Sequence, residues 1–333
     1  MDIHVEQRPS NSADLPRIQQ LISEELQAVE QALATPHASI ALITEISHHM
    51  LQAGGKRLRP MIVLLVALAC NYNGKKHIQL AAILELIHAA TLLHDDVVDA
   101  STKRRNRPTA NALWDNKMAV LSGDYVYALA FQQMTDLQNP AILSVLAAAT
   151  SYIVEGEILQ LTQQQQAIID QATYLDVIDR KTARLFSVAA ESAAMLGEQS
   201  SDLITSCKLF GKHFGSAYQI INDIQDYSEQ THITGKNQGD DLTEGKPTLP
   251  FIFAYEQANH KERQILAATL QQQAPIESAF ELIQQYDTLR QSSTYAKRLL
   301  HLALEHLAPL SASPYKTGLI QLTQAIIQLA PSS

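Results

Sequence analysis

The 333-residue sequence has few of the residues that break regular structure or cross-link a chain. It contains 12 glycines, 12 prolines and 2 cysteines, whereas an average chain has about 7% glycine and about 5% proline. No proline occurs between Pro140 and Pro247, and Gly156 is the one glycine between Gly123 and Gly197. Strand-rich folds need turn residues far more often than this. The scarcity therefore excludes an all-β chain and favours long, uninterrupted helices.

The sequence also lacks a basic excess, a cysteine framework and a long apolar run. Its formal net charge is −9, which argues against a general nucleic-acid binder, because such proteins need a basic surface. Cys70 and Cys207 lie far apart, so we expect two buried free thiols in a reducing compartment. The longest apolar run, Met61 to Cys70, is ten residues long, while a bilayer helix needs about 20. We therefore expect a cytoplasmic protein without a transmembrane segment.

Apolar residues recur with the period of an α-helix. One such face carries Leu15, Ile18, Ile22, Val29 and Leu33. The pattern predicts helices over 14–33, 38–52, 58–70, 77–101, 109–137, 140–163, 171–196, 200–229, 247–257, 260–271, 275–288, 292–308 and 314–330. We expect a mobile tail over 1–13, a polar, glycine-rich loop over 231–246, and one all-α domain over 14–333.

The segment from Leu80 to Ala100 combines an apolar helix with closely spaced carboxylates. Asp95 and Asp99 are four residues apart, so on a helix they share one face. Like charges at this spacing repel each other, and a divalent cation between them would relieve the repulsion. Hard carboxylate oxygens suit Mg²⁺, which keeps several waters and bridges to substrate phosphates. A solvated acidic helix end is the alternative interpretation of this pattern taken alone.

Basic segments accompany this acidic helix. Residues 54–60 read GGKRLRP, and residues 103–107 read KRRNR. Backbone N–H groups at a helix start, together with lysine and arginine side chains, make a cradle for a diphosphate. A second acidic set, Asn222, Asp223 and Asp226, also has helical spacing. The combination predicts a metal–diphosphate site with room for more than one diphosphate.

These motifs, in this order, resemble those of the trans-isoprenyl diphosphate synthases, and within them the long-chain bacterial polyprenyl (octaprenyl-type) synthases. The similarity runs from about Gly54 to Pro250 and includes GGKRLRP, ELIHAATLLHDDVVD, DRKTARLFS, YQIINDIQDY and GKNQGDDLTEGKPTLP. The resemblance implies one helical bundle around a central cavity, a homodimer, and Mg²⁺-dependent condensation of isopentenyl diphosphate with an allylic prenyl diphosphate. It implies that the product is octaprenyl diphosphate, used for quinone side chains. Transient contact with a membrane would serve the release of this product.

The resemblance also implies roles for individual residues. The metal-binding positions are Asp95, Asp99 and Asn222, and the supporting carboxylates are Asp96, Asp223 and Asp226. The positions for isopentenyl diphosphate are Lys56, Arg59, His88 and Arg105. The positions for the allylic diphosphate are Arg104, Lys181, Thr182, Gln219, Lys236 and Lys246.

Two positions depart from the family pattern. Asn222 stands where the family's second motif begins with aspartate, and its amide oxygen can ligate a metal but brings no charge. Asn106 stands where a glycine follows the arginine pair, and asparagine tolerates a left-handed backbone better than most residues.

Product length is expected to depend on the residues beneath the first acidic motif. Ala90 and Thr91, five and four positions before it, are small where a short-chain enzyme would carry bulk. Met134 and Phe131, on a neighbouring predicted helix, are candidates for the lower end of the tunnel, and ordinary core packing is the alternative for both.

Three other functions remain open at this point. A short-chain farnesyl or geranylgeranyl synthase would need a block deeper in the tunnel. A terpene cyclase would need a different second motif, which Asp226 and Gln230 do not match. A non-catalytic subunit of a heteromeric synthase would lack the aspartates, whereas this chain keeps five of six.

Overall fold

The computed structural model describes residues 14–34, 38–52, 54–105, 107–166, 169–227 and 238–330. Helices fill most of these ranges, and the only strands within them form one short hairpin. The predicted all-α fold is confirmed. The predicted tail over 1–13 and residues 231–237 of the predicted loop over 231–246 lie outside the described residues. The rest of that prediction was partly wrong, because residues Asp240–Thr243 form a short helix.

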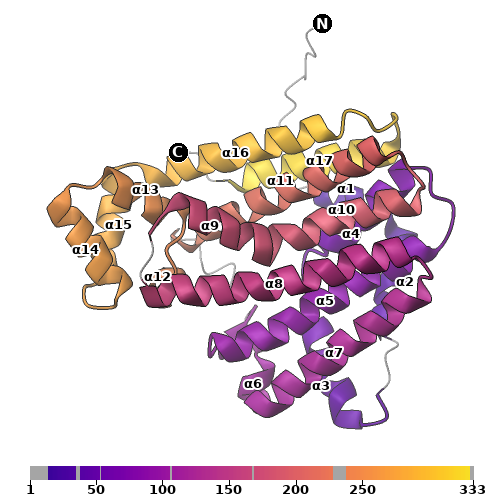
Figure 1. Ribbon diagram of the computed structural model, residues 1–333, viewed down its shortest axis with the longest axis horizontal. Coiled ribbons are helices and arrows are strands. Elements are labelled where there is room, and N and C mark those ends of the chain that lie inside the picture. Colours follow the sequence, from indigo (N-terminus) through magenta and orange to yellow (C-terminus); the bar gives the residue numbers. More distant parts are fainter. Residues whose placement is uncertain are drawn as a thin grey trace, which may run out of the picture.

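The elements follow one another as shown in Figure 1. In chain order they are α1 (Asp14–Leu21), α2 (Ser23–Ala34), α3 (Ala41–Leu51), α4 (Leu58–Ala69), α5 (Lys76–Val98), β1 (Lys103–Arg104), β2 (Arg107–Pro108), α6 (Ala110–Leu113), α7 (Asn116–Asp136), α8 (Pro140–Gln166), α9 (Gln171–Ile178), the π-helical turn η1 (Asp179–Ala183), α10 (Arg184–Leu196), α11 (Ser201–Asp226), α12 (Asp240–Thr243), α13 (Leu249–Gln257), α14 (His260–Leu270), α15 (Ile276–Gln285), α16 (Thr288–His306) and α17 (Pro314–Leu329).

The main hydrophobic core is built around α4, whose residues from Met61 to Ala67 are completely buried. A helix that is apolar on every side must be surrounded by other helices. Accordingly, α5, α10 and α17 pack against α4, while α7 covers α5 and α11 covers α10. Figure 1 shows α8 running across the bundle beside α10 and α7. The first acidic motif, at the end of α5, therefore stands on a well-packed helix.

A second, smaller core joins the C-terminal end of α11 to the helices α12 to α15. Figure 1 shows α13, α14 and α15 together at one end of the molecule. Its largest fully buried side chain is that of Phe251, and Leu242 of α12 is also fully buried. Burial of Leu242 fixes α12 and the lysine that follows it, Lys246, relative to the second acidic motif on α11.

Three of the predicted helices are interrupted within their predicted ranges. The helix predicted over 109–137 is divided into α6 and α7, because Asp115 caps α7 by accepting a hydrogen bond from Met118 N at 2.8 Å. The helix predicted over 171–196 contains the π-helical turn η1, and that over 14–33 is interrupted at Ile22.

The hairpin β1–β2 was not predicted either. Its register pairs Arg104 with Arg107, which leaves a two-residue connection. Arg105 in this connection has a left-handed backbone, with φ +51°. Such a backbone is typical of two-residue hairpins.

Glycines allow α10 and α11 to approach each other closely. A Cβ atom at Gly211 would lie 2.3 Å from the carbonyl oxygen of Phe186, and one at Gly215 would lie 2.7 Å from the Cα of Ala183. Because both obstacles are backbone atoms, no side chain could be accommodated without moving a helix. These contacts therefore fix how near α11 lies to η1.

Gly211→Ala should lower the free energy of unfolding by about 3 kcal/mol, at the upper end of the usual cost of overpacking. Gly318→Ala is the matched control, because the added Cβ would meet the side-chain atoms of Leu65 and Leu21 at 3.1 and 3.3 Å. Alanine also favours a helix over glycine by about 1 kcal/mol. Urea denaturation followed by circular dichroism measures both changes, and equal stability of the two variants would contradict the close-packing argument.

Candidate active site

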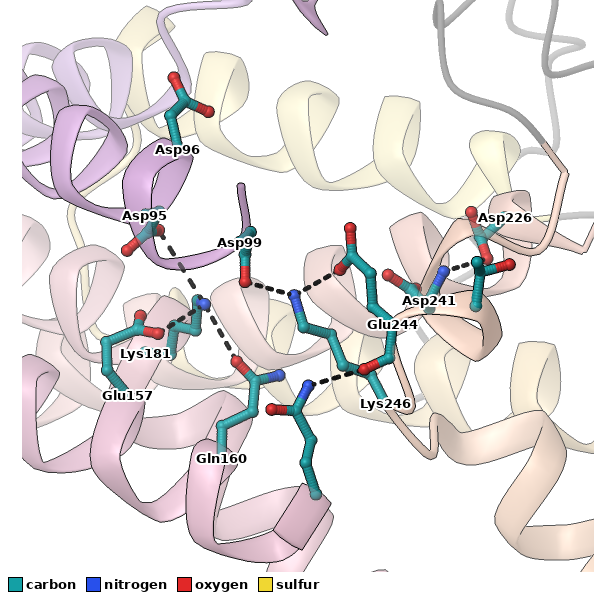
Figure 2. Close-up of polar contacts among 12 residues, drawn as sticks. Asp95, Asp96, Asp99, Glu157, Gln160, Lys181, Asp226, Asp241, Glu244 and Lys246 are labelled. Carbon is teal, nitrogen blue, oxygen red and sulfur yellow. Dashed lines mark hydrogen bonds and ion pairs between the residues drawn. The ribbon is translucent and has the colours of Figure 1, made fainter. Parts of the chain in front are cut away.

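The two aspartates of the first acidic motif lie at the end of α5 and face two lysines (Figure 2). The Asp95 carboxylate is 3.9 Å from Lys181 Nζ, and the Asp99 carboxylate is 3.0 Å from Lys246 Nζ. Lys181 comes from η1, and Lys246 follows α12. The structure thus brings three segments that are distant in sequence to one place, as the predicted site required.

Lys181 is positioned by α8, a helix to which we had assigned no site residue. Its ammonium group donates to Glu157 at 2.7 Å and to Gln160 at 3.0 Å. The approach of α8 to η1 depends on Gly156, because a Cβ there would lie 2.6 Å from Arg180 Cβ and 3.1 Å from Lys181 N. Gly156, isolated in a long glycine-free stretch, was the one sequence signal that could have located Glu157 and Gln160.

Lys246 is held by the segment that follows α11. Its ammonium group also contacts Glu244 at 2.6 Å. The same segment is fastened to Asp226, whose carboxylate accepts a hydrogen bond from Asp241 N at 3.2 Å and whose carbonyl accepts one from Gly239 N at 3.0 Å. Asp226 therefore supports the position of Lys246.

Burial raises the free energy of the charges in this acidic cluster. The pKa of Asp95 is raised, first by burial and then by the neighbouring charge of Asp99, although Lys181 opposes the shift. The pKa of Glu157 is raised for the same reasons, with burial the largest cause. Burial alone would lower the pKa of Lys246, but the charges of Asp99 and Glu244 outweigh it and raise that pKa. The carboxylates are therefore stabilised by any cation that reaches them.

Asp96 pairs with an arginine and does not face the two lysines that Asp95 and Asp99 contact. It is fully buried and points away from Asp95 and Asp99 in Figure 2. Its carboxylate pairs with the Arg104 guanidinium at 2.8 Å. Asp96 therefore supports the hairpin that carries Arg104 and Arg105.

The second acidic set is largely engaged in hydrogen bonds within the protein. Asp223 accepts hydrogen bonds from the Tyr174 hydroxyl at 2.6 Å and from Gln219 Nε2 at 2.7 Å. Thr182 Oγ1 in turn donates to Gln219 Oε1 at 2.9 Å. Asn222 differs from Asp223 and Asp226 in having a partly exposed side chain.

A group of cations lies around the start of α4 and the β1–β2 hairpin. The Arg59 guanidinium stands 4.4 Å from the centroid of the Phe186 ring, and Lys56 Nζ stands 5.9 Å from that of Tyr218. A Cβ at Gly55 would lie 2.8 Å from Arg105 Nη1, so Gly55 lets this arginine approach the loop of residues 54–57, which precedes α4.

Arg57 lies in the same loop, but carboxylates already neutralise it. It pairs with Glu30 at 2.7 Å and with Glu85 at 2.5 Å. Arg57 therefore fixes the loop, and the cations left to bind an anionic ligand there are Lys56, Arg59 and Arg105.

The cations in this group repel one another. Burial and then the charges of Arg59, Arg104 and Arg105 hold the pKa of His88 well below its usual range, so this imidazole is neutral. Burial and the charge of Arg104 also lower the pKa of Arg105. Arg59 Nε is buried and has no hydrogen-bond partner among the described residues. Such a cluster favours an anion with several oxygens, and a diphosphate meets this requirement.

Helix α3 ties the two basic segments together. His49 Nε2 is hydrogen-bonded to the Pro108 carbonyl at 2.8 Å, and Arg107 Nη1 donates to the Gln52 carbonyl at 3.2 Å. Gln52 lies two residues before the 54–57 loop, whereas Arg107 pairs with the strand that carries Arg104. The end of α3 thus sets the distance between the segments that carry Lys56 and Arg105.

The predicted product-length residues lie at different depths. Ala90 and Met134 are fully buried in α5 and α7. Thr91 is partly exposed on the same face of α5 as Asp95, and its hydroxyl donates to the His88 carbonyl at 2.8 Å. Phe131 is 36% exposed, and its role at the lower end of the tunnel stays a prediction. Lys236 and Asn106 lie outside the described residues.

The sequence and the fold are similar to those of known proteins. A model of the family described as polyprenyl synthetase matches residues 40–286. The all-trans-nonaprenyl-diphosphate synthase (geranyl-diphosphate specific) of Rhodobacter capsulatus is 41% identical over 307 residues, covering 91% of this chain and 94% of the relative. The octaprenyl diphosphate synthase of Escherichia coli K12 is 36% identical over 319 residues, covering 95% and 99% of the two chains.

Two solved structures share the fold at a TM-score of 0.91. One is a decaprenyl diphosphate synthase from Rhodobacter capsulatus, 38% identical, with 96% of this chain and 100% of that chain covered. The other is a polyprenyl synthase from Caulobacter crescentus complexed with calcium and isoprenyl diphosphate, 32% identical, with 98% and 100% covered. This chain therefore belongs to the polyprenyl synthetase family, and it is a long-chain trans-prenyl diphosphate synthase.

Proposed function

We propose that the chain condenses isopentenyl diphosphate with an allylic prenyl diphosphate in a Mg²⁺-dependent reaction and makes all-trans octaprenyl diphosphate for quinone side chains. The observation that carries this proposal is the pairing of Asp95 with Lys181 and of Asp99 with Lys246. Carboxylates and ammonium groups from distant segments meet at one point, which is what binding of a metal–diphosphate complex requires.

The allylic diphosphate would bind at the acidic cluster. Asp95, Asp99 and Asn222 would hold Mg²⁺ there. The described residues contain no ready cage of three or more histidine, cysteine, aspartate or glutamate ligands. Mg²⁺ completes its coordination shell with waters and substrate phosphate oxygens. When bound, Mg²⁺ supplies positive charge that stabilises the departing diphosphate.

The cationic groups around the cluster would contact the same diphosphate. Lys181 and Lys246 would turn from the carboxylates to its oxygens once the metal neutralises Asp95 and Asp99, and Arg104 and Lys236 would add further positive charge. The remaining residues assigned to this substrate, Thr182 and Gln219, would lie beside the allylic end to which the diphosphate is attached.

Isopentenyl diphosphate would bind at the cation group. Lys56, Arg59 and Arg105 would contact its oxygens, and a phosphate oxygen would satisfy the buried Arg59 Nε. Neutral His88 would donate one hydrogen bond to the same diphosphate.

The reaction needs no side-chain nucleophile. The bond between the allylic carbon and its diphosphate breaks, and the isopentenyl double bond forms the new carbon–carbon bond at that carbon. A proton then leaves the adduct, and the released diphosphate accepts it. The completely buried apolar walls of α4 and α5 would exclude the water that otherwise captures the allylic cation.

The length of the product would depend on small residues on α5. Thr91 shares the face of Asp95 and is small, so a growing chain could pass along this face. Ala90 and Met134, both fully buried, would border the tunnel further along.

We also propose that two copies of the chain associate through α8. This helix carries the exposed apolar residues Val154, Ile158 and Leu161, which are 53%, 60% and 39% exposed. Their spacing places them on one face, and a continuous apolar face marks an interaction site.

The membrane is the alternative partner for this face. Both α5 and α8 are long and apolar enough to span a bilayer, but 67% of the α5 window is buried in the core and only 33% of the α8 window is buried. A second copy is preferred because α8 ends in polar glutamines and lies flat on the bundle. Free Cys70 and Cys207 support a location in the reducing cytoplasm.

Mass spectrometry of the dephosphorylated product, made from isopentenyl and farnesyl diphosphates, tests the proposed activity. We expect a C40 alcohol from the wild type and none when Mg²⁺ is chelated.

Asp99→Asn should lower kcat by about 100-fold or more, because one charged metal ligand is lost. Thr91→Phe should shorten the product and spare the first condensation. A wild-type product of C15 or C20, or undiminished turnover in EDTA, would refute the proposal.

Gly55→Ala should raise KM for isopentenyl diphosphate by about 10-fold, since displacing Arg105 removes a charge-assisted hydrogen bond. Its added Cβ would lie 2.8 Å from Arg105 Nη1. Gly54→Ala is the control, because its backbone is left-handed (φ +76°) but nothing lies within 4 Å of the added Cβ. Steady-state kinetics with each substrate varied separates the two. An equal rise of KM in both variants would assign the effect to backbone strain.

Ile158→Asp should convert the dimer to a monomer, because a carboxylate would be buried in the proposed interface. Light scattering after size exclusion should give a mass near 36.8 kDa for this variant and twice that for the wild type. Leu329→Asp, at a 38% exposed position of α17, should leave the dimer intact. A monomeric wild type that floats with lipid vesicles would show that α8 serves a membrane instead.

A further inference from the structure

Four side chains from three elements form one chain of hydrogen bonds that ends in the active site. The Tyr174 hydroxyl of α9 donates to Asp223 Oδ2 at 2.6 Å. Gln219 Nε2 donates to the other oxygen of the same carboxylate at 2.7 Å. Thr182 Oγ1, in η1, donates to Gln219 Oε1 at 2.9 Å. Thr182 lies next to Lys181, which faces Asp95.

The direction of each hydrogen bond in this chain follows from the one before it. A carboxylate accepts hydrogen bonds, so the amide nitrogen of Gln219 must face Asp223. The amide oxygen of Gln219 then faces Thr182, and because that oxygen can only accept, the threonine hydroxyl must donate to it. The hydrogen of this hydroxyl is thereby turned toward Gln219, and its oxygen lone pairs are turned away.

Burial gives this arrangement its rigidity. Tyr174 is 4% exposed and Asp223 is 5% exposed, so water cannot readily replace either partner. Burial and the adjacent charge of Asp223 hold the pKa of Tyr174 well above its usual value. The phenol therefore keeps its proton and remains a donor. Its helix is anchored in turn by Asp170, which caps α9 through Thr173 N at 2.8 Å.

We propose that Tyr174 is a positioning residue that acts through Asp223 and Gln219 to orient the hydroxyl of Thr182, so that its oxygen, not its hydrogen, faces the allylic substrate. This inference rests on the proposed function, because it assumes that the allylic diphosphate binds beside Lys181 and Thr182. Tyr174 itself touches no substrate.

The orientation matters for the rate of the chemical step more than for binding. Positive charge develops on the allylic carbon as its diphosphate leaves. A fixed oxygen dipole stabilises that charge in the transition state, while it contributes little in the ground state, where the carbon is neutral. Loss of the orientation should therefore lower kcat and leave both KM values nearly unchanged.

Tyr174→Phe tests the proposal, because it removes only the hydroxyl. We expect kcat to fall about 10-fold, the value of a net hydrogen bond, with KM for each substrate within about 2-fold. Tyr286→Phe is the matched control, since Tyr286 also donates to a carboxylate at 2.6 Å, that of Glu262, but between α14 and α15. Its kcat should stay within about 2-fold of the wild type.

Double mutants at positions 174 and 182 distinguish positioning of the Thr182 hydroxyl from general support of the fold by Tyr174. The variant Thr182→Val has no hydroxyl to orient, so adding Tyr174→Phe to it should lower kcat no further. The variant Thr182→Ser keeps the hydroxyl, so adding Tyr174→Phe to it should again lower kcat about 10-fold. Losses that multiply in both backgrounds, or an unchanged kcat in Tyr174→Phe, would overturn the proposal.

A second variant covers the case in which Tyr174→Phe does not fold. Asp223→Asn keeps the size of the side chain but can donate to Gln219, which would reverse the chain of hydrogen bonds. It should lower kcat and show the same lack of additivity with Thr182→Val, and independent losses would again overturn the proposal. A folded wild-type protein with no condensation activity would refute the proposed function itself, which is a separate outcome.

Discussion

Repulsion between like charges at fixed positions is the constraint on which the rest of the site depends. Burial and the charge of Asp99 destabilise the charge on Asp95, while burial and the neighbouring arginines keep His88 neutral. Neither group of charges is balanced completely by the protein. In the proposed function a metal ion would relieve the first repulsion and a diphosphate the second, so the free energy stored in the site would be released when both substrates bind. The site is therefore selective for ligands that carry complementary charge.

A site of this kind requires supports that resist the repulsion. The buried helix α4 and the close contact at Gly211 provide the rigid background for the cations and for η1. The end of α3 holds the two basic segments through His49 and Gln52. Arg57 adds a further tie, because its ion pairs with glutamates fix the loop without using a substrate-binding cation. The polar contacts around the site thus divide into those that face ligands and those that hold the frame.

The sequence predicted local features better than long-range ones, for a physical reason. The four-residue spacing of Asp95 and Asp99 depends only on helical periodicity, and the structure places Asp95 in the last turn of α5 and Asp99 at its C-cap. The role of Glu157 depends on how closely α8 approaches η1, which is decided by tertiary packing at Gly156. The resemblance to a family supplied Lys181, although nothing in the periodicity distinguishes it from a surface lysine. The break before α7 could have been predicted, because the Asp115 cap is encoded locally.

The second acidic motif contributes more to geometry than to charge. Asp223 accepts from Tyr174 and Gln219, and Asp226 accepts from the segment that positions Lys246. Asn222 stands where the family has aspartate, so the second acidic motif lacks one negative charge. Asn222 is also the residue of this motif whose side chain is partly exposed. In the proposed reaction, the negative charge that attracts Mg²⁺ would therefore come mainly from α5 and from the substrate's own diphosphate. Binding of metal and binding of allylic substrate would then be coupled, since each supplies charge that the other requires.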